Sequence, residues 1–300
     1  MVWQQPPSYL HTQDELPPKA KDIFFGVTTC QRYADEYAQA VYQTWARLVE
    51  PRMLRFFSDA PHPLLPTVVT SKLDMAQVNK KLKKNYRKRV AHKERYLRQE
   101  SNRSLELFAW AWDHVPDAKW FYKGDDDSFV RVEWLQALLN EFDATKPLYL
   151  GSTRRFRGKL VPVLERDMAR TIEHTDLRYA MGGAGYVLSR GLLEQWRPLM
   201  NQCIVYNGED KTVAKCIWDT LHIEPLNVPG FSFVHPDKID PVTRDNFIWI
   251  GIVLTREEML FRKKKTNSTH SLVYEVASPE TKSFGPKYIP FTVPSIGASI

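Results

Sequence analysis

Near the start of the chain, two short apolar segments flank a helical stretch, and both of them end on polar residues. Asp22–Thr29 carries Ile, Phe and Val before its two threonines, and Met53–Phe57 leads into Ser58 and Asp59. Between them, Tyr33–Val49 repeats its apolar residues at about the helical period and is stopped by a proline. Because parallel strands end at a shared edge where α/β proteins bind ligands, these segments predict a β-α-β unit with a site at its polar ends.

The alternation of helical and strand-like segments continues along the chain. A helix is expected after the basic segment, capped by Ser101 or Asn102, and a run of three successive aspartates follows the next strand. We expect one elaborated α/β domain over 22–278, an extended lead-in over 1–21 and a Pro- and Ser-rich, loosely packed tail over 279–300. The further expected strands are Trp120–Lys123, Leu148–Leu150, Tyr186–Leu188 and Phe247–Leu254.

The basic charge of the chain is concentrated in one segment. The formal net charge is +7, and Lys80–Arg103 alone carries eleven Lys or Arg residues against two acids. We interpret this segment as a solvated loop or helix face, with binding of nucleic acid, anionic substrates or membrane surfaces as the alternatives. The hydrophobic fraction of 43% excludes a disordered chain, and no apolar run is long enough to predict a spanning helix.

Signals for targeting are weak. Met1–Pro18 lacks the apolar core of a signal peptide, so we expect a chain that works in the cytosol or lacks an upstream targeting segment. Asn102 and Asn267 lie in Asn-x-Ser/Thr acceptor sites, which is weak evidence for secretion.

Three adjacent carboxylates stand where a buried aromatic strand ends. Asp125, Asp126 and Asp127 repel one another, so a cation or hydrogen bonds must offset the cost. On an extended segment Asp125 and Asp127 point to the same side, while Asp126 faces backbone amides or a basic partner. Oxygen ligands suit Mg²⁺ or Mn²⁺. The alternatives are an acidic turn that caps the next helix and, less favoured, the D-x-D of aspartyl-phosphate phosphatases, which expects Thr or Val where Phe129 stands.

Two later segments add small and acidic residues. Gly182–Gly185 precedes a strand, and its small residues let a ligand or another backbone approach closely or form a tight turn. Glu209 and Asp210 follow Gly208 at the expected start of a helix, where carboxylates serve either as caps or as functional groups.

The three cysteines are too few for a disulfide scaffold, and they contain no C-x-x-C pair. Cys203 and Cys216 flank the acidic turn. A disulfide between them would stabilise the fold by roughly 3 kcal/mol and hold the acids in place. Cys30 would then remain as a buried thiol.

In their order and spacing, these motifs resemble glycosyltransferase family 31, which contains Fringe and the core 1 β1,3-galactosyltransferases. The likeness extends from about Asp22 to about His235. The segments that carry it are Phe25–Thr29, Phe56–Asp59, Lys119–Val130, Gly182–Ser189 and Gly208–Asp210.

The resemblance implies a GT-A fold, a Rossmann-like mixed sheet flanked by helices. It also implies a UDP-sugar donor, Mn²⁺ or Mg²⁺ as cofactor, and inverting transfer of a hexose or N-acetylhexosamine that forms a β1,3 linkage on a glycan or glycoprotein. Asp127 would bind the metal, Asp125 would contact the metal's water shell or the ribose, and His235 would be a further ligand. Asp210 would be the catalytic base, with Glu209 as the second candidate.

The same resemblance implies which residues line the donor, namely Thr28, Thr29, Asp59, Asp125, Asp126, Gly182, Gly183, Ala184 and Gly185. It implies the Golgi or ER lumen, with contact to a membrane only through an anchor that the sequence given lacks. Two alternatives remain open: a non-catalytic UDP- and metal-binding relative of the same fold, and a nucleic-acid-binding protein that uses the basic segment.

Overall fold

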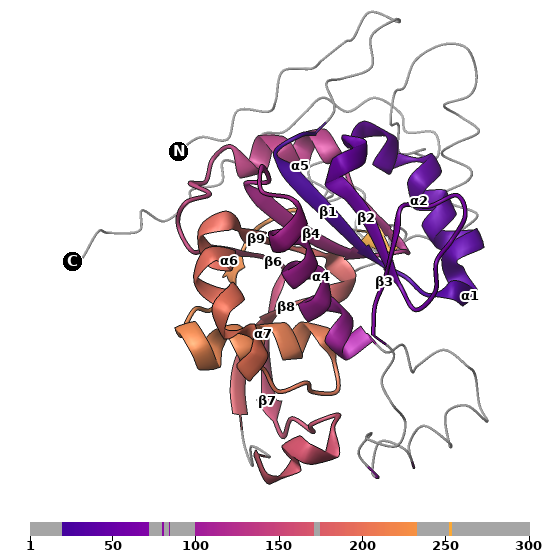
Figure 1. The fold of residues 1–300 in the computed structure, drawn as a ribbon. Helices are drawn as coiled ribbons and strands as arrows, with labels where there is room; N and C mark the ends of the chain where they lie inside the picture. Colours follow the sequence, from indigo (N-terminus) through magenta and orange to yellow (C-terminus); the bar gives the residue numbers. More distant parts are fainter. Residues whose placement is uncertain are drawn as a thin grey trace, which may run out of the picture.

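The computed structural model describes residues 20–71, 80, 84, 100–170, 175–232 and 252–253 (Figure 1). The lead-in and the tail expected from the sequence lie outside these residues, except for Ala20 and Lys21. Among the described residues, no helix has both the length and the apolar character needed to cross a membrane.

A seven-stranded mixed sheet forms the centre of the fold, in the order β10-β6-β9-β4-β1-β2-β3. β1 lies parallel to both β2 and β4, while β9 runs antiparallel between β4 and β6. Every residue of β1 is buried, as expected for a central parallel strand covered on both faces. The strands are β1 (Ile23–Thr28), β2 (Leu54–Ser58), β3 (Thr67–Val69), β4 (Trp120–Asp125), β6 (Tyr149–Gly151), β9 (Tyr186–Ser189) and β10 (Leu226–Asn227).

Helices pack around this sheet, and α4 contacts β1, β4 and α7 (Figure 1). The α-helices after the first crossover are α4 (Glu100–His114), α5 (Val132–Leu139), α6 (Arg190–Trp196) and α7 (Glu209–Leu221). Short 3-10 turns cover Pro51–Met53, Glu165–Arg170, Gly182–Ala184 and Arg197–Gln202. The mixed α/β fold with a central sheet flanked by helices, which the sequence predicts, is therefore confirmed.

The first crossover differs from the single helix expected over Tyr33–Val49. It consists of α1 (Gln31–Tyr33), a π-helical segment (Ala34–Ala38), α2 (Gln39–Gln43) and a 3-10 turn (Trp45–Leu48). Helix α2 ends because Thr44 leaves helical geometry, at φ −114° and ψ −112°, and its hydroxyl donates back to the carbonyl of Ala40 at 2.7 Å.

The expected caps of α4 were also wrong, because Ser101 and Asn102 lie inside the helix. The amide of Asn102 donates to Glu106 Oε1, one turn further on, at 2.7 Å.

Two small antiparallel sheets complete the described structure. β7 (Thr153–Gly158) pairs with β8 (Thr175–Ala180). β5 (Ser128–Phe129) pairs with β11 (Ile252–Val253), which is the described part of the strand expected over Phe247–Leu254.

The register of the large sheet brings the polar motifs together. Thr28 at the end of β1 is the register partner of Asp125 at the end of β4. Because β9 runs in the opposite direction, its first residue, Tyr186, pairs with Lys123 near that same end of β4. The glycine segment before β9 therefore lies at the sheet edge that carries the aspartates.

Candidate active site

The threonines at the end of β1 hold two of the three aspartates. Thr28 Oγ1 donates to Asp125 Oδ1 at 2.6 Å, and Thr29 Oγ1 donates to Asp126 Oδ2 at 2.7 Å. The amide of Asp126 also donates to the Thr28 carbonyl at 3.1 Å. Asp126 is fully buried, whereas the side chain of Asp125 is 18% exposed. These bonds offset the repulsion between neighbouring carboxylates and fix the acidic turn to the sheet edge.

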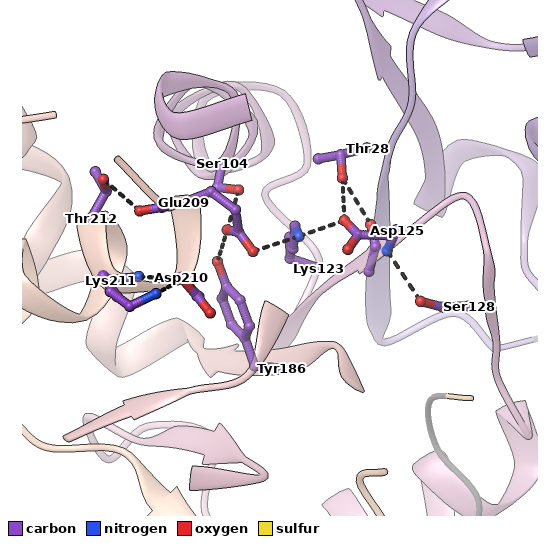
Figure 2. Close-up of polar contacts among 12 residues, drawn as sticks. Thr28, Ser104, Lys123, Asp125, Ser128, Tyr186, Glu209, Asp210, Lys211 and Thr212 are labelled. Carbon is purple, nitrogen blue, oxygen red and sulfur yellow. Dashed lines mark hydrogen bonds and ion pairs between the residues drawn. The ribbon is translucent and has the colours of Figure 1, made fainter. Parts of the chain in front are cut away.

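A buried lysine connects this turn to helix α7 (Figure 2). Lys123 Nζ lies 2.7 Å from Asp125 Oδ1 and 2.8 Å from Glu209 Oε1. Burial by itself lowers the pKa of Lys123, but the carboxylates of Asp125 and Glu209 outweigh that effect and raise the pKa above its ordinary value. Lys123 is therefore a buried ammonium ion held between two acids.

Glu209 is held by three donors that come from three different elements. Besides Lys123 of β4, Ser104 Oγ of α4 donates to Glu209 Oε2 at 2.7 Å, and the Tyr186 hydroxyl of β9 donates to the same oxygen at 3.0 Å. Burial raises the pKa of Glu209, the Lys123 ammonium opposes that shift, and the carboxylates of Asp210 and Asp125 add to it. The side chain is thus fixed as a hydrogen-bond acceptor.

Asp210 has a different environment, although it is the next residue. Its side chain is 17% exposed, and Oδ1 accepts the backbone N–H of Lys211 at 2.8 Å. The Lys211 ammonium lies 3.5 Å from the same oxygen and 4.9 Å from the centre of the Tyr179 ring of β8. Asp210 therefore reaches the surface of the site, whereas Glu209 points inward to its donors.

The glycine segment packs directly on these groups, and two of its positions require glycine. A Cβ at Gly182 would lie 2.0 Å from Glu209 Oε1 and 3.6 Å from the Cβ of Asp210. Gly185 has φ +70°, and a Cβ there would lie 2.4 Å from the hydroxyl of Tyr122. The close approach expected of this segment is therefore an approach to the acid pair and to β4.

Cys203 and Cys216 form a disulfide in the structure, with their Cα atoms 5.2 Å apart. Cys216 lies in α7, so the bond ties the helix that begins with the acid pair to the chain before it. Cys30, expected as a buried thiol, is half-buried.

Replacing Cys203 and Cys216 with serine is expected to lower the free energy of unfolding by about 3 kcal/mol, because the crosslink no longer restricts the unfolded chain. Urea unfolding of both proteins measures the difference. A reducing agent should destabilise the wild type to the level of the variant and leave the variant unchanged. Equal midpoints in the absence of reductant would contradict this expectation.

The remaining residues expected to line the donor occupy varied positions. Thr28 and Thr29 are almost fully buried and hold Asp125 and Asp126. Asp59 Oδ1 accepts the backbone N–H of Gln31 at 2.8 Å and so caps the first turn of α1. Gly183 is half-buried and Ala184 is buried at the sheet edge.

A divalent cation at this edge would be held by Asp125 and Asp127. Among the described residues, no three His, Cys, Asp or Glu side chains are grouped closely enough to enclose a metal, and His235 lies outside those residues. The two carboxylates are hard oxygen donors, and that of Asp125 reaches solvent. They fit an ion such as Mg²⁺ or Mn²⁺, which commonly takes one or two carboxylates and completes its shell with substrate phosphates and water.

Three residues that the sequence motifs do not mark as functional, Lys123, Ser104 and Tyr186, are parts of the site. A signal for Lys123 was present, because a lysine in the middle of a buried aromatic strand needs an acidic partner. Nothing local in the sequence marks Ser104 or Tyr186, which meet Glu209 only in the folded chain.

The interpretation of the basic segment as a solvated loop or helix face is wrong for Arg103. This residue is 2% exposed and therefore does not belong to a solvated face. Its guanidinium donates to the carbonyl of Thr29 at 2.6 Å and to Thr70 Oγ1 at 3.1 Å, so it supports the end of β1. Lys80 and Lys84 are exposed, and residues 81–83 and 85–99 lie outside the described part of the chain.

Comparison with known proteins identifies relatives of this chain. The model of the Fringe-like family matches residues 18–249. Chondroitin sulfate synthase 3 of Homo sapiens is 26% identical over 65% of this chain and 20% of that protein. Fringe glycosyltransferase of Drosophila melanogaster is 26% identical over 79% of this chain and 52% of its own length. The human β-1,3-glucosyltransferase is 27% identical over 73% of this chain and 37% of its own length.

Among solved structures, a glycosyltransferase involved in glycosylation of the major capsid of PBCV-1 superposes with a TM-score of 0.41 at 12% identity. The match covers 82% of this chain and 100% of that one. The chain spans between one fifth and about half of the length of the three curated relatives named above.

The chain is a mixed α/β protein whose central sheet carries acidic and glycine-rich segments at one edge. Since the family model covers most of its length, the chain belongs to the Fringe-like family.

Proposed function

We propose that the chain is a metal-dependent inverting glycosyltransferase that moves a hexose or N-acetylhexosamine from a UDP-sugar to a hydroxyl of a glycan or glycoprotein, forming a β1,3 linkage. Membership of the Fringe-like family supports the transfer reaction, and the β-1,3-glucosyltransferase among its relatives supports the linkage. The observation that carries the proposal is the junction of the aspartate turn with the Glu209-Asp210 turn through Lys123.

Asp127 and Asp125 would hold the divalent cation, with His235 as a further candidate ligand. A bound Mn²⁺ or Mg²⁺ supplies Lewis-acid stabilisation of the charge that develops on the UDP leaving group. Thr28 and Lys123 keep the Asp125 carboxylate directed at the sheet edge, and Asp126 stays within the fold, bonded to Thr29.

Asp210 would act as the catalytic base. In an inverting displacement the acceptor oxygen attacks the anomeric carbon, its proton passes to a carboxylate, and UDP leaves with the electrons of the broken bond. Of the two adjacent acids, Asp210 is the better candidate because, within the described chain, its carboxylate accepts only from the next residue. It is also slightly more exposed than Glu209, at 17% against 11% of the side chain. Glu209 already accepts from three other residues.

The lumen of the ER or Golgi is the proposed location. The disulfide between Cys203 and Cys216 supports an oxidising compartment, where such bonds persist.

The proposed function is tested by measuring UDP release from a panel of UDP-sugars with and without Mn²⁺. One donor should be hydrolysed in a metal-dependent manner, and Asp127→Ala should reduce this activity to the level seen without metal, because the variant lacks a ligand carboxylate. Undiminished activity of the variant would refute the metal role. Binding of UDP and Mn²⁺ with no turnover on any donor or acceptor would instead identify a non-catalytic relative.

A further inference from the structure

Lys123 faces two carboxylates that belong to different parts of the proposed site. Its side chain has no exposed surface, and its ammonium lies within 2.8 Å of both Asp125 Oδ1 and Glu209 Oε1. Asp125 is the last residue of β4 and a proposed metal ligand. Glu209 is the first residue of α7 and precedes the proposed base, Asp210. A single buried cation is thus shared between the two halves of the site (Figure 2).

A buried ammonium ion needs a compensating charge. Transfer of an unpaired charge out of water is very costly, so Lys123 can stay charged inside the fold only while at least one carboxylate remains beside it. A divalent cation drawn to Asp125 competes with Lys123 for the same carboxylate. The structure provides a second partner for the ammonium, because Glu209 is held in place by Ser104 and Tyr186 independently of Asp125.

We propose that Glu209 is a positioning residue that serves as the alternative counter-ion of Lys123 and thereby frees Asp125 to bind the divalent cation. This inference rests on the proposed function and goes beyond it, since it assigns to Glu209 a role in metal affinity without contact to the metal. Glu209 is then not the second candidate for the base, and its neighbour Asp210 alone carries that role.

The charges around Lys123 determine whether neutralising Glu209 raises or lowers the metal affinity. With Glu209 neutralised, Asp125 becomes the only carboxylate within hydrogen-bonding distance of the ammonium among the contacts found in the described chain. The Lys123–Asp125 pair would tighten, and the metal would have to break it without compensation. Metal affinity should therefore fall, although every carboxylate proposed as a ligand remains intact.

The test is a calorimetric titration of Mn²⁺ into the full chain in the presence of saturating UDP. Glu209→Gln keeps the shape and an acceptor for Ser104 and Tyr186, and it should weaken Mn²⁺ binding by about tenfold, the usual scale for residues behind a metal ligand. Glu209→Asp, which retains the charge, should bind Mn²⁺ more tightly than the Gln variant. These two results together support the proposal.

A control separates this charge from a general disturbance of α7. Asp219→Asn removes the acidic partner of Lys215 further along the same helix. It should bind Mn²⁺ much more tightly than Glu209→Gln. Equal affinity of Glu209→Gln and the wild type, or an equal loss in Asp219→Asn, would overturn the inference. A wild type that binds no Mn²⁺ with UDP would instead contradict the proposed function itself.

Discussion

Replacing Asp210 with asparagine is expected to reduce the turnover number about a thousandfold, within the range that a positioned general base contributes. The amide has nearly the same size and can still accept the N–H of Lys211, so the start of α7 should keep its geometry. It cannot take a proton from the acceptor hydroxyl. Binding of UDP and Mn²⁺ should be unchanged, because Asp210 is proposed as the base and not as a ligand of the metal or the nucleotide.

The measurement is the steady-state rate of UDP release at saturating donor, together with the affinity for UDP and Mn²⁺ from calorimetry. Asp219→Asn is the matched control, since it makes the same chemical change on the same helix at a carboxylate that is 44% exposed and paired with Lys215. The control should retain the wild-type rate. A turnover number within threefold of the wild type for Asp210→Asn would contradict the assignment of the base.

The polar residues at the ends of the strands could be predicted as a site, because the position of each strand is marked by its local sequence. Buried strands are marked by apolar runs, and parallel strands of an α/β sheet end at one edge. The sequence therefore indicated polar residues at the ends of these strands, and the register of β1 and β4 pairs Thr28 with Asp125 there. The turn at Glu209 could be predicted for a similar reason, since a helical period begins directly after it.

The contacts that distinguish neighbouring residues could not be predicted in the same way. Glu209 and Asp210 are adjacent in the sequence and are both expected at the start of the same helix. They differ because Ser104 and Lys123, at a distance of 105 and 86 residues, contact Glu209 and not Asp210, as does Tyr186. Arg103 likewise has the sequence context of a solvated basic segment. Its burial follows from the position of Thr29 and Thr70, which come from a different part of the chain.

The helical part of the first crossover is interrupted after α2. Thr44 is a weak sequence signal for this interruption, and hydrophobic periodicity does not detect it. Thr44 can donate its hydroxyl back to the preceding turn, which bends or ends a helix when tertiary contacts favour it. Such a contact exists at Trp45, whose indole N–H donates to the carbonyl of Ser128 at 3.0 Å. The hydrophobic period continues through this break, so the sequence indicated one helix where the structure has several short helical segments.

Replacing Lys123 with methionine is expected to lower the free energy of unfolding by about 3–5 kcal/mol, the usual cost of removing one partner from a buried ion pair. Methionine fills a similar volume, so the loss would arise from the two carboxylates, Asp125 and Glu209, that the ammonium now neutralises. Urea unfolding monitored by tryptophan fluorescence measures this difference. Lys215→Met is the control, because it makes the same change at a buried lysine whose partner Asp219 is 44% exposed and can be solvated when the lysine is removed, so it should cost less than Lys123→Met.

A second variant identifies the origin of the cost. Adding Glu209→Gln to Lys123→Met removes one of the two uncompensated charges, so the double variant should be more stable than Lys123→Met alone. Glu209→Gln in the wild-type background should instead be destabilising, because Lys123 then loses one of its two partners. This reversal of sign is expected only if the two residues interact directly through charge, since additive effects of independent sites keep their sign. If Glu209→Gln has the same effect in both backgrounds, the buried lysine does not link the aspartate turn to α7 energetically.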